Sequence, residues 1–281
     1  MKFQHTIQPR DTFFDLRLKE IWRYRDLLLL FVRRDFLATY KQTILGPLWF
    51  LIKPIFQTVM MTFIFSRVAG LPTDGIPPLL FYITGTTSWN YFANCLRSTS
   101  NSFTANASIF GKVYFPRAIA PLSIIVSNLI QFFISLIIFF AVYFYYILKG
   151  ANISANSILL LFPALVIIMG FMGLGFGMII SSMTTKYRDL QNLVQFGVQL
   201  AMYATPVIIP LSMLEEKSGH FQWFIKANPM CGVIESFRYG FLSKGTFSWS
   251  LIAYSACFTV IVFLVGLLIF NKTEKNFMDT V

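Results

Sequence analysis

The chain has 281 residues, of which 56% are hydrophobic, 17% aromatic and only 12% charged. Soluble domains carry about 25% charged residues, so this composition excludes an ordinary soluble domain. The net charge is +11, but no run of five or more basic residues occurs, which argues against a nucleic-acid-binding protein. Apolar runs of about 20 residues, the length that crosses a bilayer core, recur along the chain and indicate an integral membrane protein.

Cysteine and histidine are too few and too scattered to build a disulfide framework or a metal site. Cys95, Cys231 and Cys257 show no CxxC spacing, so we interpret them as small apolar residues. The two histidines are isolated, and no metal or other cofactor is predicted for this chain. The first apolar run, residues 27–32, is short and is followed by two arginines, unlike a cleavable signal peptide. The N-terminus is therefore predicted to stay in the cytosol.

An amphipathic helix is predicted ahead of the first membrane span. Thr12, with Asp15 three residues later, marks its start. Apolar residues then recur at spacings of three, four or seven, interrupted by Arg25: Leu18, Ile21, Trp22, Leu29, Val32 and Phe36. Most basic residues fall off this stripe, a pattern typical of a helix lying in the membrane interface. The alternative is an amphipathic helix packed on a partner protein, and both descriptions can hold at once.

Six membrane-spanning helices are predicted beyond the Gly46-Pro47 break, at about residues 48–66, 79–96, 119–148, 157–181, 190–209 and 250–270. The fold class is therefore all-α, with residues 1–47 as cytosolic tail and amphipathic helix and residues 48–281 as the six-span domain. The third span is longer than one crossing needs, so it tilts, bends at Pro121 or protrudes. Residues 211–245 are predicted to form short, re-entrant outer helices, split at Asn228-Pro229.

Three of these spans carry polar or small residues at informative positions. The second span holds side chains that need partners in a bundle or a watery cavity, because lipid offers none: Thr84, Thr86, Thr87, Ser88, Asn90 and Asn94. In the fourth span, Gly173 and Gly177 form a GxxxG pattern that predicts close helix packing. The fifth span has a polar residue at every fourth position, which places all of them on one helical face: Gln191, Gln195, Gln199 and Tyr203. Such a face either joins helices or lines an aqueous path.

The distribution of charge predicts the orientation in the membrane. Six spans put both termini on one side, and sixteen Lys and Arg residues lie in the segments of that side, against six in the other loops. The positive-inside tendency therefore places both termini in the cytosol. All twelve Asp and Glu residues lie outside the predicted spans. This argues against an ion-driven antiporter, because intramembrane carboxylates are the usual ion relays.

The sequence lacks the motifs of an energy-converting or hydrolytic enzyme. No GxxxxGK[ST], GxSxG or HExxH pattern occurs. The outer loop holds a few titratable residues that we interpret as ordinary solvated charges: Glu215, Glu216, His220 and Glu235. The chain is therefore predicted to be a passive membrane body rather than an enzyme, so uphill transport requires free energy from another subunit.

Five stretches, taken together, carry a family resemblance: YRDLLLLFVRRDFLATYKQTILGPLW, GKVYFPRAIAPLS, KYRD, TPVIIP and NPMCGVIESFRYG. They resemble the type-2 ABC exporter permeases of the polysaccharide branch, for which Wzm is the representative name. That branch exports O-antigen, capsule and teichoic acid. The resemblance covers nearly the whole chain in the right order.

The resemblance implies an assembly and a place for each segment. Such permeases are homodimers, and each chain carries a separate Wzt-like ATPase subunit, which binds the ATP and Mg. Residues 12–45 would be an interface helix, and residues 97–117 would include a coupling helix seated in a cleft of the ATPase. Residues 211–245 would be two re-entrant helices at the outer mouth, and spans one and five would border the glycan channel.

The resemblance also implies three sets of site residues. ATPase coupling is assigned to Lys112, Tyr114, Pro116 and Arg117. The interface helix and the point where substrate enters are assigned to Trp22, Arg25, Arg33, Arg34, Tyr40 and Lys41. Flat rings stack on the apolar faces of sugars and polar groups bind hydroxyls, so the glycan path is assigned to Tyr82, Trp89, Tyr91, Gln195, Gln199 and Tyr203. No catalytic residue is assigned.

The implied function is export of a lipid-linked polysaccharide, an O-antigen or similar surface glycan, across the bacterial inner membrane during lipopolysaccharide biosynthesis. One alternative is a permease of the same superfamily that moves a drug, a lipid or another small amphiphile. A second alternative, from another class, is a membrane enzyme acting on polyprenyl-linked sugars. That enzyme would need acidic or histidine residues at the membrane face, and this chain supplies almost none.

Overall fold

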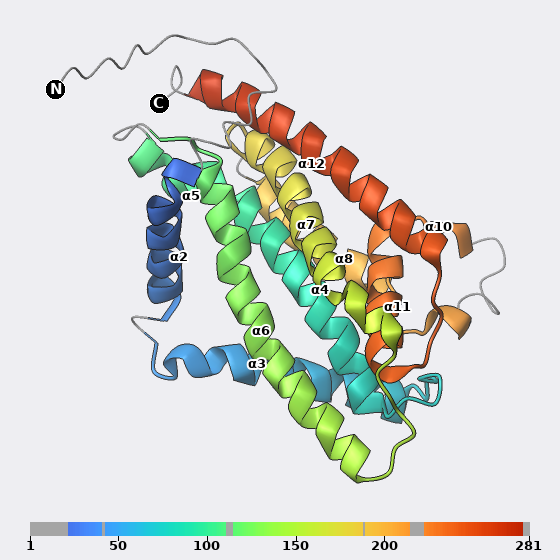
Figure 1. Ribbon diagram of the computed structural model, residues 1–281. Helices are drawn as coiled ribbons and strands as arrows, with labels where there is room; N and C mark the ends of the chain where they lie inside the picture. The colour runs from blue at the N-terminus through green and yellow to red at the C-terminus, as the bar shows by residue number, and fades with distance from the viewer. Residues whose placement is uncertain (1–21, 41–42, 111–114, 188, 214–221, 278–281) are drawn as a thin grey trace.

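Helices make up the regular structure of the chain. A computed structural model describes residues 22–40, 43–110, 115–187, 189–213 and 222–277, and no strand occurs among them. Figure 1 shows long helices running side by side, with α2 and α3 at one flank. The elements are α2 (Arg25–Tyr40), η1 (Gly46–Leu48), α3 (Trp49–Met61), η2 (Thr62–Val68), α4 (Pro78–Ser100), α5 (Ser102–Phe110), α6 (Ile119–Leu148), η3 (Ser157–Leu161), α7 (Phe162–Thr184), α8 (Leu190–Tyr203), α10 (Gln222–Lys226), α11 (Pro229–Leu242) and α12 (Trp249–Phe277). The predicted all-α class is confirmed.

Four helical segments of the described chain are long and apolar enough to cross a membrane: Gly46–Val68, Ile119–Leu148, Ser157–Thr184 and Trp249–Thr273. They correspond to the predicted first, third, fourth and sixth spans. The predicted third span is helix α6, which has the predicted bounds and runs for 30 residues. Its proline, Pro121, lies in the first turn, where the missing N–H costs no helical hydrogen bond.

The predicted second and fifth spans differ from these four. Helix α4 has 23 residues, or about 35 Å, which is long enough to cross, but polar residues lower its hydropathy. Helix α8 ends at Tyr203 and not near residue 209 as predicted, because Pro206 lacks the N–H that a continuing helix needs. Its 14 residues span about 21 Å, less than the about 30 Å of a bilayer core. The count of six spans stays a prediction.

Helix α4 forms the centre of the bundle. Seventeen of its 23 residues are buried, and α3, α6, α7, α8 and α11 all contact it. Two of its amides bond to neighbouring helices: Asn90 donates to Gln57 on α3 at 2.8 Å and Asn94 to Gln131 on α6 at 3.5 Å. Hydroxyl groups on α4 donate instead to carbonyls of the same helix: Thr84, Thr86 and Ser88. These five polar side chains therefore find partners inside the protein, as the sequence predicts. The buried hydroxyls of Tyr82 and Thr99 on the same helix have no hydrogen-bond partner among the described residues.

Glycines let α7 approach the helices on both of its sides. A methyl group on Gly173 would lie 2.8 Å from the carbonyl oxygen of Phe92 on α4. A methyl group on Gly175 would lie 2.8 Å from the backbone nitrogen of Phe263 on α12. Figure 1 shows α7 running between α4 and α12. The predicted close packing around the GxxxG pattern is confirmed, and its partners are α4 on one side and α12 on the other.

We expect Gly175→Ala to destabilise the protein by about 1–3 kcal/mol, because the methyl group forces α12 away from α7. Gly197 on α8 is the matched control, since nothing lies within 4 Å of a methyl group placed there. Gly197→Ala should be neutral or stabilise by up to about 1 kcal/mol through helix propensity. Thermal unfolding of the purified protein in detergent measures both variants. Equal stability of the two variants would contradict the close contact between α7 and α12.

Candidate functional site

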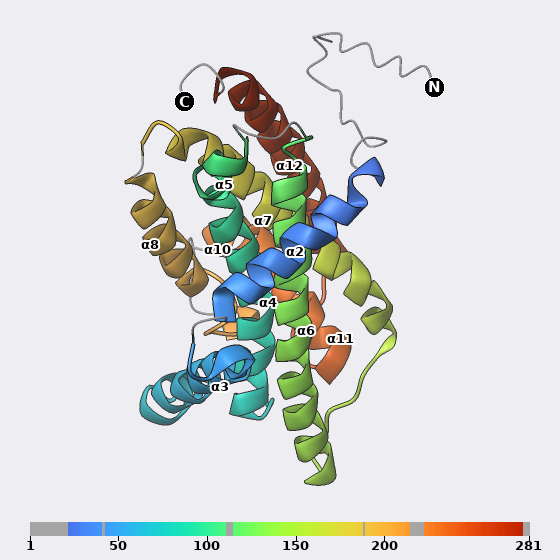
Figure 2. The same ribbon diagram turned by 90° about the vertical axis from the view of Figure 1, so that its left-hand side faces the viewer.

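Helix α2 packs obliquely across α6 while keeping one apolar face open. Figure 2 shows α2 in front of α6, and the two helices are in contact. Phe31 and Val32 are buried, whereas Leu29 and Leu30 are each 60% exposed and Trp22 is 71% exposed. An open face of Trp and Leu on a helix rich in arginine suits the membrane interface. The predicted stripe is thus divided, with one part packed on the protein and one part exposed.

The helix α5 lies in the predicted coupling connection and is held by contacts to three other elements. The ring of Phe103 is fully buried and stacks on Phe270 of α12, with ring centroids 4.4 Å apart. The Phe103 backbone N–H donates to the Ser181 hydroxyl of α7 at 3.3 Å. Just before α5, the carbonyl of Ser100, the last residue of α4, accepts from the Thr184 hydroxyl of α7 at 3.0 Å. Helix α5 is therefore in direct contact with α7 and α12.

An arginine joins α5 to α2. Arg34 donates through Nη2 to the Oδ1 of Asn106 at 2.9 Å and pairs with Asp35 at 2.7 Å. Its guanidinium also lies over the ring of Phe31, 4.5 Å from the centroid. Asn106 is buried and donates in turn to the carbonyl of Ser102 within α5. Neighbouring Arg33 is exposed. Arg34 therefore connects the amphipathic helix to the coupling connection.

The structure places two of the four predicted coupling residues. Pro116 and Arg117 are buried in the chain, and the Arg117 guanidinium lies 5.4 Å from the ring centroid of Phe110. Lys112 and Tyr114 lie outside the described residues. Of the predicted interface residues, Arg25 is exposed like Arg33. Lys41 and the side chain of Tyr40 also lie outside the description.

The six residues predicted for a glycan path fall into two groups. Tyr82, Trp89 and Tyr91 of α4 are 0%, 2% and 4% exposed, so they lie in the core of a single chain. The other three lie together on the exposed surface of α8: Gln195, Gln199 and Tyr203. The structure therefore brings together the members on α8 and separates them from those on α4. Burial of the α4 residues comes from the five helices that surround α4.

Helix α11 carries a buried ion pair that the sequence did not reveal. Arg238 Nη1 and Glu235 Oε1 are 2.6 Å apart, and the two side chains are 0% and 2% exposed. The interpretation of Glu235 as a solvated charge is therefore wrong. The signal that could have indicated this pair is the i, i+3 spacing of opposite charges within an otherwise apolar helix. The predicted break at Asn228-Pro229 is confirmed, since the Asn228 side chain accepts from the Met230 N–H at the start of α11.

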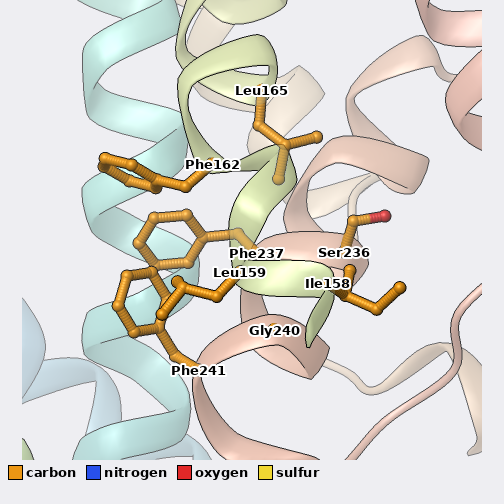
Figure 3. A pocket seen from close by; sticks show the side chains of 8 residues that line it. All are labelled: Ile158, Leu159, Phe162, Leu165, Ser236, Phe237, Gly240 and Phe241. Atoms are coloured by element: carbon orange, nitrogen blue, oxygen red, sulfur yellow. The ribbon is translucent and has the colours of Figure 1, made fainter. Parts of the chain in front are cut away.

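A small apolar crevice lies between α11, η3 and the start of α7. Figure 3 shows its lining, which includes Phe162 and Leu165 on one side and Phe237 and Phe241 on the other. The space inside it is about 150 Å³ even with adjoining open solvent included, and it has no room for a water-sized molecule, whereas ligand pockets hold roughly 300–1,000 Å³. The hydroxyl of Ser236, also in the lining, donates a hydrogen bond to the carbonyl of Gly232 within α11. This crevice is a packing feature and offers little to a sugar.

These features define a helical membrane protein whose central helix α4 is buried in the core and whose helix α5 is joined to the amphipathic helix α2. The ABC-2 type transporter family matches residues 26–242, and the chain belongs to that family of transporter membrane subunits. It is 31% identical over 254 residues to the "O-antigen export system permease protein RfbA" of Klebsiella pneumoniae, covering 90% of this chain and 94% of the relative. It is 25% identical over 264 residues to the protein of that name from Myxococcus xanthus, covering 94% and 98%. The family resemblance predicted from the sequence is confirmed.

We expect Arg34→Met to loosen the contact between α2 and α5. Hydrogen bonds to charged groups contribute about 1.5–3 kcal/mol, and partial exposure of Arg34 reduces the expected loss to about 1 kcal/mol. Arg33→Met is the matched control, because Arg33 is exposed on the same helix. Its effect on stability should stay within about 0.5 kcal/mol. Thermal unfolding measures both, and equal losses would contradict a specific role of the Arg34–Asn106 contact.

Proposed function

We propose that this chain is the transmembrane permease subunit of an ABC exporter that moves a lipid-linked polysaccharide, such as an O-antigen, from the cytosol across the inner membrane. The observation that carries the proposal is the match to two export permeases along almost their whole length. Coverage of 94% and 98% of those relatives leaves no large part of either protein without a counterpart here. The four apolar helices supply the membrane body that such a subunit needs.

The energy for export comes, in this proposal, from two copies of a separate Wzt-like ATPase subunit, which binds the ATP and Mg. The chain has no phosphate-binding loop of its own. The 97–117 connection is the element on which the ATPase would act. Its helix α5 is tied to α2, α7 and α12, which supports a role in passing movement from the ATPase to the membrane helices.

The glycan path, in this proposal, lies between two copies of the chain. Packing around α4 fills the middle of one copy, so the core of a single chain is a poor route for a polymer. A two-fold pair can enclose a path that one copy does not. The exposed polar side chains of α8, Gln195, Gln199 and Tyr203, support that helix as a wall of the path. Closure of the ATPase would rock the two halves, and repeated cycles would thread the glycan outward.

We expect deletion of the gene to leave the cell surface without its polysaccharide while lipid-linked polymer accumulates in the cytosol. A plasmid copy of the gene should restore surface display, because the permease is the step that crosses the membrane. Electrophoresis of surface polysaccharide and chemical analysis of the intracellular glycan measure the two pools. An unchanged surface polysaccharide in the deleted strain would reject the proposed substrate class.

We expect the double change Gln195→Ala and Gln199→Ala to slow export by about two- to tenfold for each hydrogen bond that the glycan loses, since such bonds contribute about 0.5–1.5 kcal/mol. The amount of folded protein should not change, because both side chains are exposed. Leu193→Ala with Leu200→Ala is the matched control on the apolar side of the same helix. Rates of surface appearance after induction provide the comparison. Equal slowing in both double variants would reject the polar stripe as the glycan-facing side.

A further inference from the structure

We propose that Glu235 and Arg238 are positioning residues for the outer end of the transport path. In this proposal they hold the turn that follows α8, residues 204–206, in a fixed place against α11 and α4. The inference rests on the proposed export function, because the turn begins directly after Tyr203, the last residue of the polar stripe on α8. The pair touches no substrate itself and acts through the turn.

Arg238 contacts three different parts of the chain. It donates through Nη1 to Glu235 at 2.6 Å and through Nη2 to the carbonyl oxygen of Pro206 at 2.8 Å. Its guanidinium also lies 3.8 Å from the ring centroid of Phe81 on α4. The side chain is fully buried, so the planar guanidinium is clamped between α4, α11 and the turn. Few side chains other than arginine can make two directed hydrogen bonds and a ring contact at once.

Glu235 extends the same arrangement to the segment after α11. Its Oε2 accepts from the Thr246 N–H at 3.4 Å. A methyl group on Gly245 would lie 2.9 Å from that oxygen, and Gly245 has a φ of +99°, which favours glycine. The carboxylate thus fixes the loop between α11 and α12, while its other oxygen orients Arg238.

Further hydrogen bonds show that the turn and the neighbouring outer loops are joined. Asn228, the N-cap residue of α11, donates to the carbonyl of Ala204 at 3.5 Å, so the start of α11 also contacts the turn. Ser212 donates to the carboxylate of Asp74 at 2.7 Å. Lys244 donates to the carbonyl of Gly75 at 2.7 Å. The loop between α3 and α4 therefore holds both the segment after the turn and the segment after α11.

The energetics of a buried ion pair favour a positioning role over a stabilising one. Removing two charges from water costs several kcal/mol per ion, and the mutual attraction only roughly offsets this cost. An apolar pair of similar size often stabilises a protein as well or better. What an apolar pair lacks is direction, because it neither donates to Pro206 nor accepts from Thr246. Loss of the pair should therefore affect the placement of the turn more than the amount of folded protein.

The decisive variant replaces both charges with residues of similar size, Glu235→Met with Arg238→Met. The single change Arg238→Met is the contrast, because it leaves a buried carboxylate without its partner. Lys149→Met is the control, since Lys149 is exposed at the end of α6. Each variant is expressed in the strain lacking the gene and purified with its partner ATPase. Three quantities are measured: folded complex, polysaccharide displayed per folded complex, and labelling of Cys231 by a water-soluble maleimide.

Cys231 reports on α11 independently of the substrate. It is buried, one turn before Glu235, and its labelling is quantified by mass spectrometry of the modified peptide. We expect the double variant to fold in near wild-type amount, to display at least about tenfold less polysaccharide per folded complex and to label Cys231 faster. The single variant should yield much less folded complex, because an unpaired buried charge is strongly destabilising. The control should match the wild type in all three measurements.

Wild-type display and wild-type Cys231 labelling in a folded double variant would overturn the proposal. Arg238→Lys is the second variant and decides the matter if the double variant does not fold. It keeps the charge but cannot reproduce both hydrogen bonds and the contact with Phe81, so it should lower display and raise labelling. Wild-type behaviour of Arg238→Lys in both measurements would also overturn the proposal. If the wild-type gene itself fails to restore surface polysaccharide, the proposed function is rejected, and Cys231 labelling still decides whether the pair positions α11.

Discussion

A bilayer core contains no water to satisfy polar groups, and this constraint organises the protein around α4. The helix is too polar to face lipid, so five other helices surround it and supply its burial. Its amides reach Gln57 and Gln131 on neighbouring helices, and several of its hydroxyls donate to carbonyls of the same helix. Helix α4 is thereby largely buried, while the apolar segments Gly46–Val68 and Ile119–Leu148 leave much of their surface exposed.

Close approach of backbones complements this arrangement. Glycines on opposite sides of α7 allow α4 and α12 to pack against it without intervening side chains. At the end of the bundle that carries α5, Phe103 and Ser181 join α5 to α12 and α7, and Arg34 joins it to α2. Helix α5 is thus held by contacts to three other helices. Helix α5, which is proposed to lie next to the ATPase, is therefore packed onto the bundle through α2, α7 and α12.

The end of the bundle that carries α11 combines apolar packing with a buried ion pair. Helix α11 packs through Gly232 on the backbone of Leu251 and presents aromatic rings toward α6 and α7. Among these apolar contacts, Arg238 donates to the carbonyl of Pro206 in the turn after α8, and Glu235 accepts from the Thr246 N–H in the loop after α11. Apolar contacts are not directional, whereas these hydrogen bonds form only when α11, the turn and the loop keep their relative positions. In the proposed exporter, this combination would keep the turn after α8 in place while a glycan passes.

Local features of the sequence determined much of the fold. The apolar run of α6 has the predicted bounds, and the break at Asn228-Pro229 appears where proline and a capping side chain place it. The polar residues of α8 share one helical face, as their four-residue spacing predicts. Tertiary structure alone decided which side chains are buried, since Tyr82 and Trp89 lie in the core and Glu235 meets Arg238 away from water. Burial depends on helices distant in the sequence, and no local pattern records how those helices pack.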